Sequence, residues 1–252
     1  MDRDFYDQVI LVTGGTGALG SKVSESFMNF SPKAIIITYR SETEMQESKT
    51  KILDGSSKKQ KENHHTQVEF VKADITHEDE VKTLISGILE KFGQVHVLAN
   101  VVGGYIGGKS VSETSEEEWD KMMLINLKSA FLISKHVLNS MKTKKFGKIV
   151  HISSATGAKA SGNDSAYAAS KAGLIRLVES MAEETNGLNI TINCILPTII
   201  DTESNRKAMP KSNFSTWIAP ADLANVICFL ASEDSKIING VALPTRGNSY
   251  GS

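Results

Sequence analysis

Three residues between positions 153 and 171 have the types and spacing needed for acid–base chemistry. Tyr167 and Lys171 are four apart in a segment rich in helix formers, SAYAASKAGLIRL, so they should share one helix face. An ammonium at about 4 Å, with an effective dielectric constant near 20, favours a phenolate by about 4 kcal/mol. That preference is about what lowers a tyrosine pKa from 10 towards 7. We therefore expect Lys171 to lower the pKa of Tyr167, so that Tyr167 can exchange a proton near neutral pH.

Ser154 is the third of these residues, and it lies thirteen positions before Tyr167. It follows the apolar run at residues 148–152, so we expect it just beyond the end of a strand. There its hydroxyl could donate a hydrogen bond to a substrate oxygen as charge develops on it. The alternative is that a tyrosine and a lysine at helical spacing are ordinary surface residues. The spacing alone does not decide between the two, and the rest of the chain must.

The elements that position these residues follow a regular pattern, because apolar β-branched runs alternate with amphipathic stretches. Continuous apolar runs predict strands buried on both faces, and the alternation predicts a parallel sheet with right-handed crossovers. We therefore expect an α/β Rossmann fold, with a doubly wound parallel sheet of about seven strands, as one domain over residues 1–252. The expected strands are 8–13, 34–38, 68–72, 95–100, 148–153, 189–196 and 240–243. The expected helices are 19–30, 42–53, 78–92, 115–141, 166–185 and 220–231, with a polar, solvated excursion at 54–66.

The composition excludes several classes of function. A formal net charge of −1 gives no basic field for nucleic acid, and no apolar run approaches the roughly 20 residues of a membrane span. The first residues, MDRDFYDQ, lack the apolar core of a signal peptide, so we expect a cytoplasmic protein without a membrane partner. The two cysteines and six histidines have no metal-ligand spacing, and we expect no metal site.

A glycine-rich turn, TGGTGALG at residues 13–20, lies between the first expected strand and the first helix. Glycines at this place allow a tight turn and a close approach of the backbone to a pyrophosphate, which meets the free amides of the helix N-terminus. The sequence therefore predicts a dinucleotide site. Its expected contacts in the turn are Gly14, Thr16, Gly17, Ala18 and Leu19.

The end of the second expected strand indicates which dinucleotide binds. An NAD site usually has an acidic residue here for the ribose hydroxyls, but this chain has Tyr39, Arg40 and Ser41. Arg40 can form charge-assisted contacts with a 2′-phosphate, and Ser41 can add a hydroxyl donor. We therefore expect NADP(H) in preference to NAD(H). The alternative is that Arg40 only pairs with Glu42 or Glu44 at the surface.

With the glycine turn, Asp74, Asn100, Asn126, Ser154, Tyr167 and Lys171 in view, nearly the whole chain resembles the short-chain dehydrogenase/reductase family, and within it the 3-oxoacyl reductases. The resemblance implies that Tyr167 donates or accepts the proton. It implies that Lys171 binds the nicotinamide ribose and lowers the pKa of Tyr167. It further implies that Ser154 orients the substrate oxygen and that Asn126 holds a water in a proton relay.

The resemblance also implies cofactor contacts outside the glycine turn. They are Asp74 and Ile75 at the adenine, Asn100 and Val101, Tyr167 and Lys171, and Pro197, Ile200 and Thr202 at the nicotinamide amide. The chain departs from the family pattern at three places. Ala18 replaces the middle glycine of the turn, Asn100 is followed by VVG instead of NAG, and Thr198 replaces a glycine.

These residues predict an NADP(H)-dependent oxidoreductase that moves hydride between nicotinamide and a carbonyl or secondary alcohol, with a 3-oxoacyl compound or another ketone as the small-molecule substrate. One alternative is a pterin reductase, because GGTGALG and GGYIGG resemble parts of the dihydropteridine reductases, although those enzymes generally lack the serine. Another is a cofactor-binding regulatory protein without turnover.

Residues 201–217 are long and polar, and the resemblance implies that they form a lid over the substrate. Met209, Phe214 and Trp217 could form an apolar wall of this lid. Its three cations, Arg206, Lys207 and Lys211, could meet an anionic substrate such as a phosphopantetheine thioester. The family also implies a homotetramer or homodimer.

Overall fold

The first strand, β1 (Val9–Thr13), is buried at every residue because it lies inside a parallel sheet with a neighbour on each side. The computed structural model describes residues 5–56 and 66–247. Its seven strands have the order β3-β2-β1-β4-β5-β6-β7, and every pairing between them is parallel. The remaining strands are β2 (Ala34–Tyr39), β3 (Gln67–Lys72), β4 (Val97–Asn100), β5 (Gly147–Ile152), β6 (Ile190–Pro197) and β7 (Ala242–Thr245).

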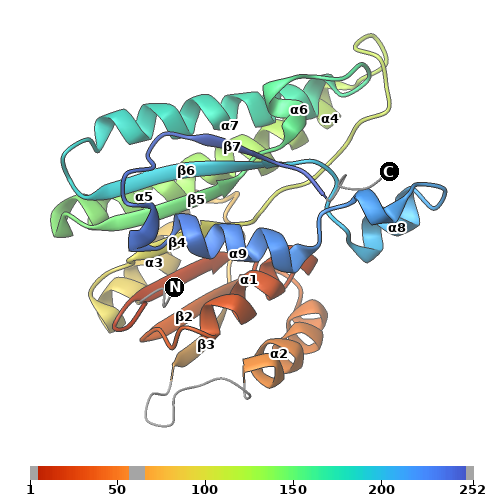
Figure 1. Cartoon of the computed structure of the whole chain (residues 1–252). Helices are drawn as coiled ribbons and strands as arrows, with labels where there is room; N and C mark the ends of the chain where they lie inside the picture. Colours follow the sequence, from red (N-terminus) through yellow and green to blue (C-terminus); the bar gives the residue numbers. More distant parts are fainter. Residues whose placement is uncertain (1–4, 57–65, 248–252) are drawn as a thin grey trace.

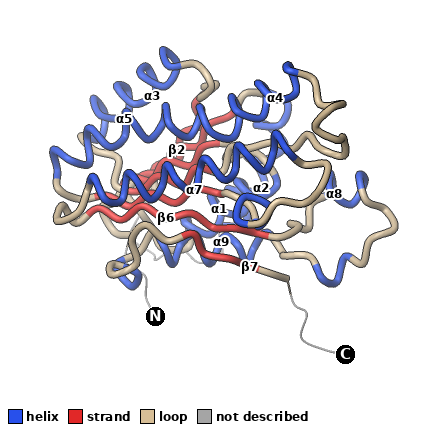
Figure 2. The backbone as a smooth tube through the Cα atoms, turned by 90° about the horizontal axis from the view of Figure 1, so that it is seen from above, coloured by secondary structure: helices blue, strands red, loops and turns tan. Residues whose placement is uncertain are grey.

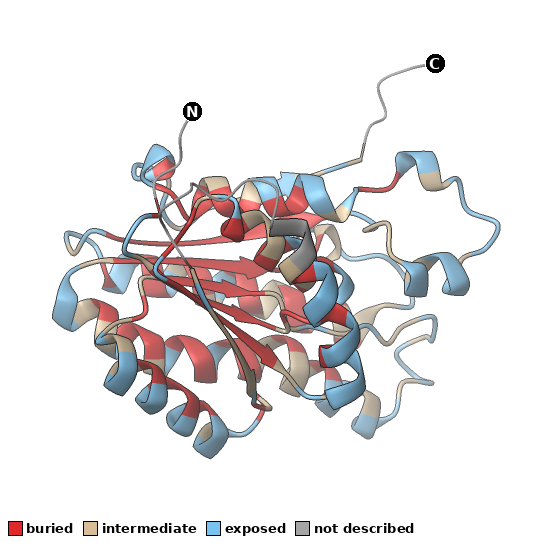
Figure 3. Cartoon of the chain, turned by 90° about the horizontal axis from the view of Figure 1, so that it is seen from below, coloured by how far each residue is buried: buried red, intermediate tan, exposed pale blue. Residues whose placement is uncertain are grey.

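Helices cover both faces of the sheet, because successive residues of a buried strand point to opposite sides. In β1, Leu11 packs into one core with α3 (Glu78–Phe92), α5 (Ser129–Lys144) and α7 (Ser165–Glu184). Its neighbour Ile10 packs into the other core with α1 (Ala18–Met28) and α9 (Pro220–Leu230). Figures 1 and 2 show the sheet between these two helical layers, and Figure 3 shows the buried strands at its centre. This arrangement confirms the expected doubly wound α/β fold.

Most predicted elements agree with the structure to within a few residues, but the expected helix at 115–141 is wrong as one regular helix. It consists of α4 (Glu116–Met123), a five-residue π-helical segment η1 (Leu124–Lys128), and α5. A π-helical turn inserts an extra residue, which apolar periodicity does not reveal. The short helices α6 (Ala155–Ala158) and α8 (Glu203–Ala208) were also not among the expected elements.

The remaining described segments are helix α2 (Glu42–Ser56), two 3₁₀ turns and the segment at residues 201–217. Helix α2 runs past its expected end, and residues 57–65 of the predicted polar excursion lie outside the described residues. Two short 3₁₀ turns, η2 (Phe214–Thr216) and η3 (Glu233–Ser235), follow α8 and α9 respectively. Residues 201–217, with α8 and η2, project from the body beyond the end of β6 (Figures 1 and 2).

Candidate active site

The carboxyl ends of β1, β4 and β5 bring the predicted site residues to one edge of the sheet. The chain order reverses between β1 and β4, because β1 is flanked by β2 on one side and β4 on the other. Open parallel sheets form their ligand crevice at such a reversal. The site is therefore fixed by strand topology before any side chain is considered.

Ser154 and Ser153 follow β5 directly, and the structure gives them different roles. Ser154 is the N-cap of α6, where its hydroxyl accepts a hydrogen bond from the Thr156 amide at 3.2 Å. Ser153 is buried, and its hydroxyl donates to the backbone carbonyl of Lys171 at 2.9 Å. Ser153 thus ties α7 to the end of β5, while Ser154 also forms a hydrogen bond with Tyr167.

Lys171 lies one turn after Tyr167 in α7, as the spacing predicts, and its side chain is turned inward. Its ammonium donates to the carbonyl oxygen of Ile152 at 2.8 Å and lies 5.9 Å from the centroid of the Tyr167 ring. Burial in this apolar setting disfavours the charged form and lowers the pKa of Lys171 to about 8. The ammonium is thus held in the site by the Ile152 carbonyl, and its burial in the charged form destabilises the fold.

The pKa of Tyr167 does not follow the expectation from its spacing to Lys171. Burial of the phenol raises its pKa, the hydrogen bond with Ser154 lowers it, and the charge of Asp164 raises it, so that the net pKa is raised. The predicted lowering by Lys171 is therefore wrong for the chain alone. Desolvation outweighs the attraction of an ammonium that points towards Ile152, and Tyr167 keeps its proton at neutral pH.

Asn126 lies in the π-helical segment, which directs its buried side chain towards the glycine-rich loop at residues 103–108. Its Oδ1 accepts from the Gly104 amide at 2.9 Å. Its Nδ2 donates to the Gly104 carbonyl at 3.1 Å and to the Ser170 hydroxyl at 3.0 Å. Asn126 therefore fastens this loop to α7 beside Tyr167 and Lys171, and π-helical turns of this kind are frequent at functional sites.

The glycine turn after β1 has the close packing that a phosphate-binding turn requires. Gly14 has a φ of 65°, in the left-handed region that favours glycine. A Cβ on Gly20 would overlap the carbonyl oxygen of Gly14, so α1 approaches the turn at a distance that only glycine permits. Ala18, which replaces the usual glycine, is exposed, and its methyl group is accommodated at the surface. The turn thus fits a dinucleotide pyrophosphate at the N-terminus of α1.

A cleft of about 200 Å³ extends from this turn to the end of β2. Eight of the predicted cofactor residues line it: Gly14, Thr16, Gly17, Tyr39, Arg40, Asp74, Ile75 and Val101. Sequence reasoning missed seven more, namely Thr38, Glu44, Ala73, Thr76, Val102, Gly103 and Ile125. The missed residues carry no motif of their own, because they line the cleft through the geometry of neighbouring strand ends.

Other predicted cofactor residues lie outside this cleft. The predicted residues that are not among its lining residues are Ala18, Leu19, Ser41, Asn100, Tyr167, Lys171, Pro197, Ile200 and Thr202. Leu19 packs into the core with α1, and the Ser41 hydroxyl accepts from the Glu44 amide at 3.3 Å. Thr202 caps α8 by accepting from the Asn205 amide at 3.1 Å.

Asn100 belongs to a buried polar chain that connects β1, β4, β5 and α5. Its Oδ1 accepts from the Thr13 hydroxyl at 2.5 Å, and its Nδ2 lies 3.0 Å from Nδ1 of His151. The other ring nitrogen of His151 lies 3.0 Å from the Ser134 hydroxyl. Complete burial lowers the pKa of His151 to about 3, so the ring stays neutral. This chain fixes the strand ends that carry the site, and sequence reasoning did not anticipate His151.

Arg40 lines the cleft at the end of β2. The alternative interpretation, in which Arg40 pairs with Glu42 or Glu44, is wrong for this structure. The Arg40 guanidinium lies 3.7 Å from a carboxylate oxygen of Asp74, while Glu42 contacts Tyr39 and Lys72. Two-thirds of the Arg40 side chain is exposed, so the guanidinium is accessible to a ligand.

The cations of the predicted lid are mostly neutralised within the lid itself. Arg206 makes a bidentate ion pair with Asp201 at 2.6 and 2.7 Å and stacks over the Phe214 ring at 4.8 Å. Lys207 pairs with Glu203 at 2.7 Å. Of the three predicted cations, only Lys211 has no ion pair with any residue in the described part of the chain. An anionic substrate would therefore have to compete with Asp201 for Arg206 and with Glu203 for Lys207.

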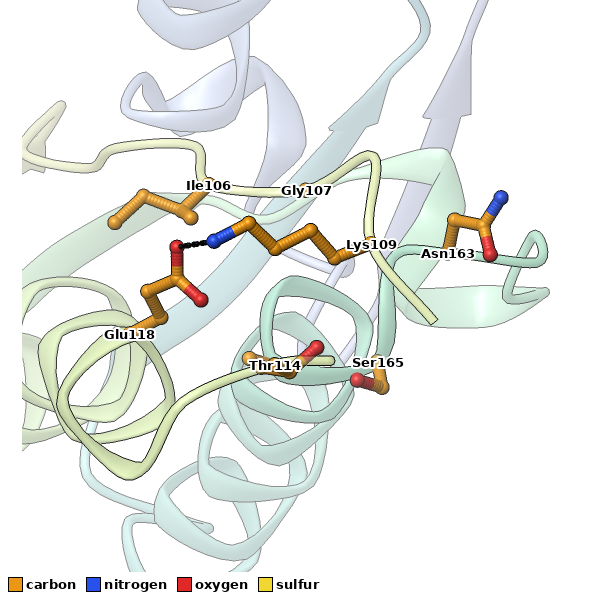
Figure 4. A pocket seen from close by; sticks show the side chains of 8 residues that line it. Ile106, Gly107, Lys109, Thr114, Glu118, Asn163 and Ser165 are labelled. Atoms are coloured by element: carbon orange, nitrogen blue, oxygen red, sulfur yellow. Dashed lines mark hydrogen bonds and ion pairs between the residues drawn. The ribbon is translucent and has the colours of Figure 1, made fainter. Parts of the chain in front are cut away.

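The segment after the glycine-rich loop packs against the starts of α4 and α7 (Figure 4). Lys109 reaches across to Glu118 at 2.5 Å, and Glu118 also completes the capping box of α4 with Ser115. The cavity between these residues measures about 10 Å³, which holds no more than a water molecule. This contact anchors the segment and offers no room for a substrate.

Comparison with known proteins agrees with this geometry. Residues 8–213 match the family described as short chain dehydrogenase. The chain belongs to this family. It is an oxidoreductase of the kind that acts on carbonyl and alcohol groups.

Among similar proteins, the 3-oxoacyl-[acyl-carrier-protein] reductase MabA of Mycobacterium tuberculosis is 30% identical over 96% of this chain and 93% of its own length. The 3-oxoacyl-[acyl-carrier-protein] reductase FabG of Escherichia coli is 29% identical over 98% of this chain and 99% of its own. The crystal structure of levodione reductase superposes with a TM-score of 0.86 at 26% identity, covering 96% and 97% of the two chains.

Residues 5–56 and 66–247 lack two further kinds of feature. No helix in these ranges has the length and apolar character needed to cross a membrane. The same ranges contain no group of three or more His, Cys, Asp or Glu side chains that could hold a metal ion.

Proposed function

We propose that this short-chain dehydrogenase reduces a ketone to a secondary alcohol with NADPH as the hydride donor. The observation that carries the proposal is the grouping of Ser154, Tyr167 and Lys171 beside the cleft that extends from the glycine turn. Gly103 lines that cleft, and a Cβ on it would lie 3.1 Å from the Lys171 ammonium. The 3-oxoacyl reductases among its relatives support a ketone as the substrate.

When bound, the reduced dinucleotide would supply a hydride to the carbonyl carbon. Tyr167 holds its proton at neutral pH because its pKa is raised, so it can donate that proton to the carbonyl oxygen as the C=O double bond becomes single. Ser154 donates a hydrogen bond to the same oxygen. Lys171 stabilises the phenolate that remains on Tyr167, and solvent then returns the proton.

The role of Asn126 in a water relay stays a prediction, as do the contacts of Pro197, Ile200 and Thr202 with the nicotinamide. The amide of Asn126 has its partners in Gly104 and Ser170, which supports a role in holding the site together. A lid formed by residues 201–217, and assembly into a homodimer or homotetramer, also remain proposals. The exposed Phe131 on α5 and Trp119 on α4 support an interface on these helices.

NADP(H) as the cofactor is supported by Arg40 at the end of β2, where an exposed guanidinium lines the cleft. A 2′-phosphate there would compete with Asp74 for Arg40. Because the existing pair is long and partly exposed, its loss would cost little, about 1 kcal/mol or less.

The test of the reaction is Tyr167→Phe, which removes the phenolic proton and keeps the ring. Reduction of acetoacetyl-CoA by NADPH should fall by at least about 10³-fold, at the upper part of the range for general acid catalysis. The dissociation constant of NADPH, measured by fluorescence titration, should change by less than about threefold. Wild-type turnover in this variant would refute the mechanism. Tight NADPH binding by the wild type without turnover on any ketone would favour a regulatory protein.

A further inference from the structure

An exposed tyrosine lies against Tyr167 and has no role in the proposed mechanism. Tyr105, in the glycine-rich loop at residues 103–108, is 61% exposed. Its ring centroid is 5.0 Å from that of Tyr167, and the two rings are almost perpendicular at 81°. A large aromatic surface therefore faces solvent directly beside the group that is proposed to deliver the proton.

Tyr105 is held in this position, although exposed side chains are usually mobile. Its hydroxyl donates to Asp164 at 2.7 Å. The partial burial of the phenol, together with this carboxylate, raises the pKa of Tyr105 to about 12, so that it remains a donor. The same loop is fastened by Gly108, whose amide donates to the Asn163 carbonyl at 2.8 Å. At Gly107 a Cβ would overlap both the Tyr105 hydroxyl and the Asp164 carboxylate, so the contact requires glycine there.

A fixed aromatic ring at the mouth of a site is suited to bind a flat ring. Its conformational entropy is already lost before the substrate binds, and aromatic pairs gain from offset or edge-to-face contact. The features expected for a phosphopantetheine thioester are weaker, because Arg206 and Lys207 are neutralised by Asp201 and Glu203. The site therefore provides a fixed aromatic contact for an uncharged ring, whereas the lid cations Arg206 and Lys207 are already paired with carboxylates.

We propose that Tyr105, held by Asp164, is a substrate-contacting specificity residue that selects a ketone carried on a flat ring over an open-chain ketone. This inference rests on the proposed ketone reduction and names the substrate class of the same site. It assigns binding to Tyr105 and leaves proton transfer to Tyr167.

The experiment compares three ketones with NADPH: 2-tetralone, whose carbonyl is on a fused ring system, and the open-chain 2-octanone and acetoacetyl-CoA. The wild type should have its highest kcat/KM on 2-tetralone. Tyr105→Leu should raise the KM for 2-tetralone about five- to tenfold, with kcat unchanged to within about twofold, because ring contact is made equally in ground and transition states. The KM values of both open-chain ketones should stay within about twofold.

Two matched variants separate the ring from its tether. Tyr105→Phe keeps the ring but loses the hydrogen bond to Asp164, and Asp164→Ala loses the same bond from the other side. Both should raise the KM for 2-tetralone alone by about two- to fourfold. Asp164→Ala also removes a charge that raises the pKa of Tyr167, so its kcat should change by a common factor for all three ketones. Should Tyr105→Leu fail to fold, as judged by its thermal unfolding, these two variants carry the test.

The possible failures are distinct. Equal changes in KM for all three ketones would show a general structural role and overturn the inference. Reduction of an open-chain ketone without reduction of 2-tetralone would overturn the inference and leave the proposed function standing. Turnover of none of the three by the wild type would overturn both.

Discussion

Replacing Lys171 by Met should remove activity and at the same time stabilise the protein at neutral pH. The ammonium is buried and its pKa is lowered from an ordinary value of 10.5 to about 8. Each pH unit of difference is worth about 1.4 kcal/mol, so the charged lysine costs the fold about 3 kcal/mol at pH 7. Methionine keeps a similar volume but leaves the Ile152 carbonyl without its donor, which costs about 1–3 kcal/mol. The net gain should be about 0–2 kcal/mol.

The sign of the pH dependence follows from the lowered pKa. Between pH 8 and 10.5 the unfolded chain binds more protons at Lys171 than the folded chain, so wild-type stability gains from rising pH in this window. The destabilisation that results from burying the charged lysine is complete below pH 8 and disappears as the pH approaches 10.5. The free energy of unfolding of the variant, minus that of the wild type, should therefore fall by about 2–3 kcal/mol between pH 7 and pH 10.

Urea unfolding at one protein concentration, at pH 7, 8, 9 and 10, measures this difference. Lys121→Met, at an exposed position of α4, controls for the change in net charge, and its difference from the wild type should be nearly constant with pH. A Lys171→Met difference that is the same at pH 7 and pH 10 would refute the reasoning, because it would mean that the ammonium is not desolvated.

Two further predictions concern the cofactor cleft. Gly20→Ala places a Cβ against the Gly14 carbonyl, so it should lower the melting temperature and abolish NADPH binding in a fluorescence titration. The control is Gly87→Ala on α3, where a Cβ meets open space and should raise stability by about 0.5–1 kcal/mol. Unchanged NADPH affinity in Gly20→Ala would contradict the assignment of the turn. Arg40→Ala should weaken NADPH binding about 5- to 30-fold, as expected for loss of an exposed charge-assisted contact, and leave NADH binding within about twofold. Equal losses for both dinucleotides would argue against a 2′-phosphate contact.

The parts of the fold that could be predicted are those in which the local sequence decides the structure. The strands at Ile35 and Ile149 are recognisable because a parallel strand buried on both faces must be apolar along its length. The pairing of Tyr167 with Lys171 is predictable because a helix brings residues four apart onto one face. The glycine turn is predictable because close approach of the backbone to itself requires glycine.

The parts that could not be predicted depend on contacts between distant residues or on burial. Tyr105 and Asp164 are 59 positions apart, and only the fold brings them together. The π-helical turn at Asn126 leaves the apolar pattern of α4 and α5 almost unchanged. The raised pKa of Tyr167 results from desolvation, whose size depends on how deeply the folded chain encloses the phenol. A spacing of four residues gives the distance to a charge but not the surrounding dielectric.

The segment at residues 201–217 begins and ends at the same place. Ile200 pairs with Ile218 in an isolated bridge, and the Asp201 amide donates to the Ile218 carbonyl at 2.8 Å. The two ends of the segment are therefore hydrogen-bonded to each other, so the number of residues between them can vary without changing where β6 ends or where α9 begins. A sequence of different length could therefore be grafted between Ile200 and Ile218 as a unit, which would test the proposed lid role of the segment while Ser154, Tyr167 and Lys171 stay in place.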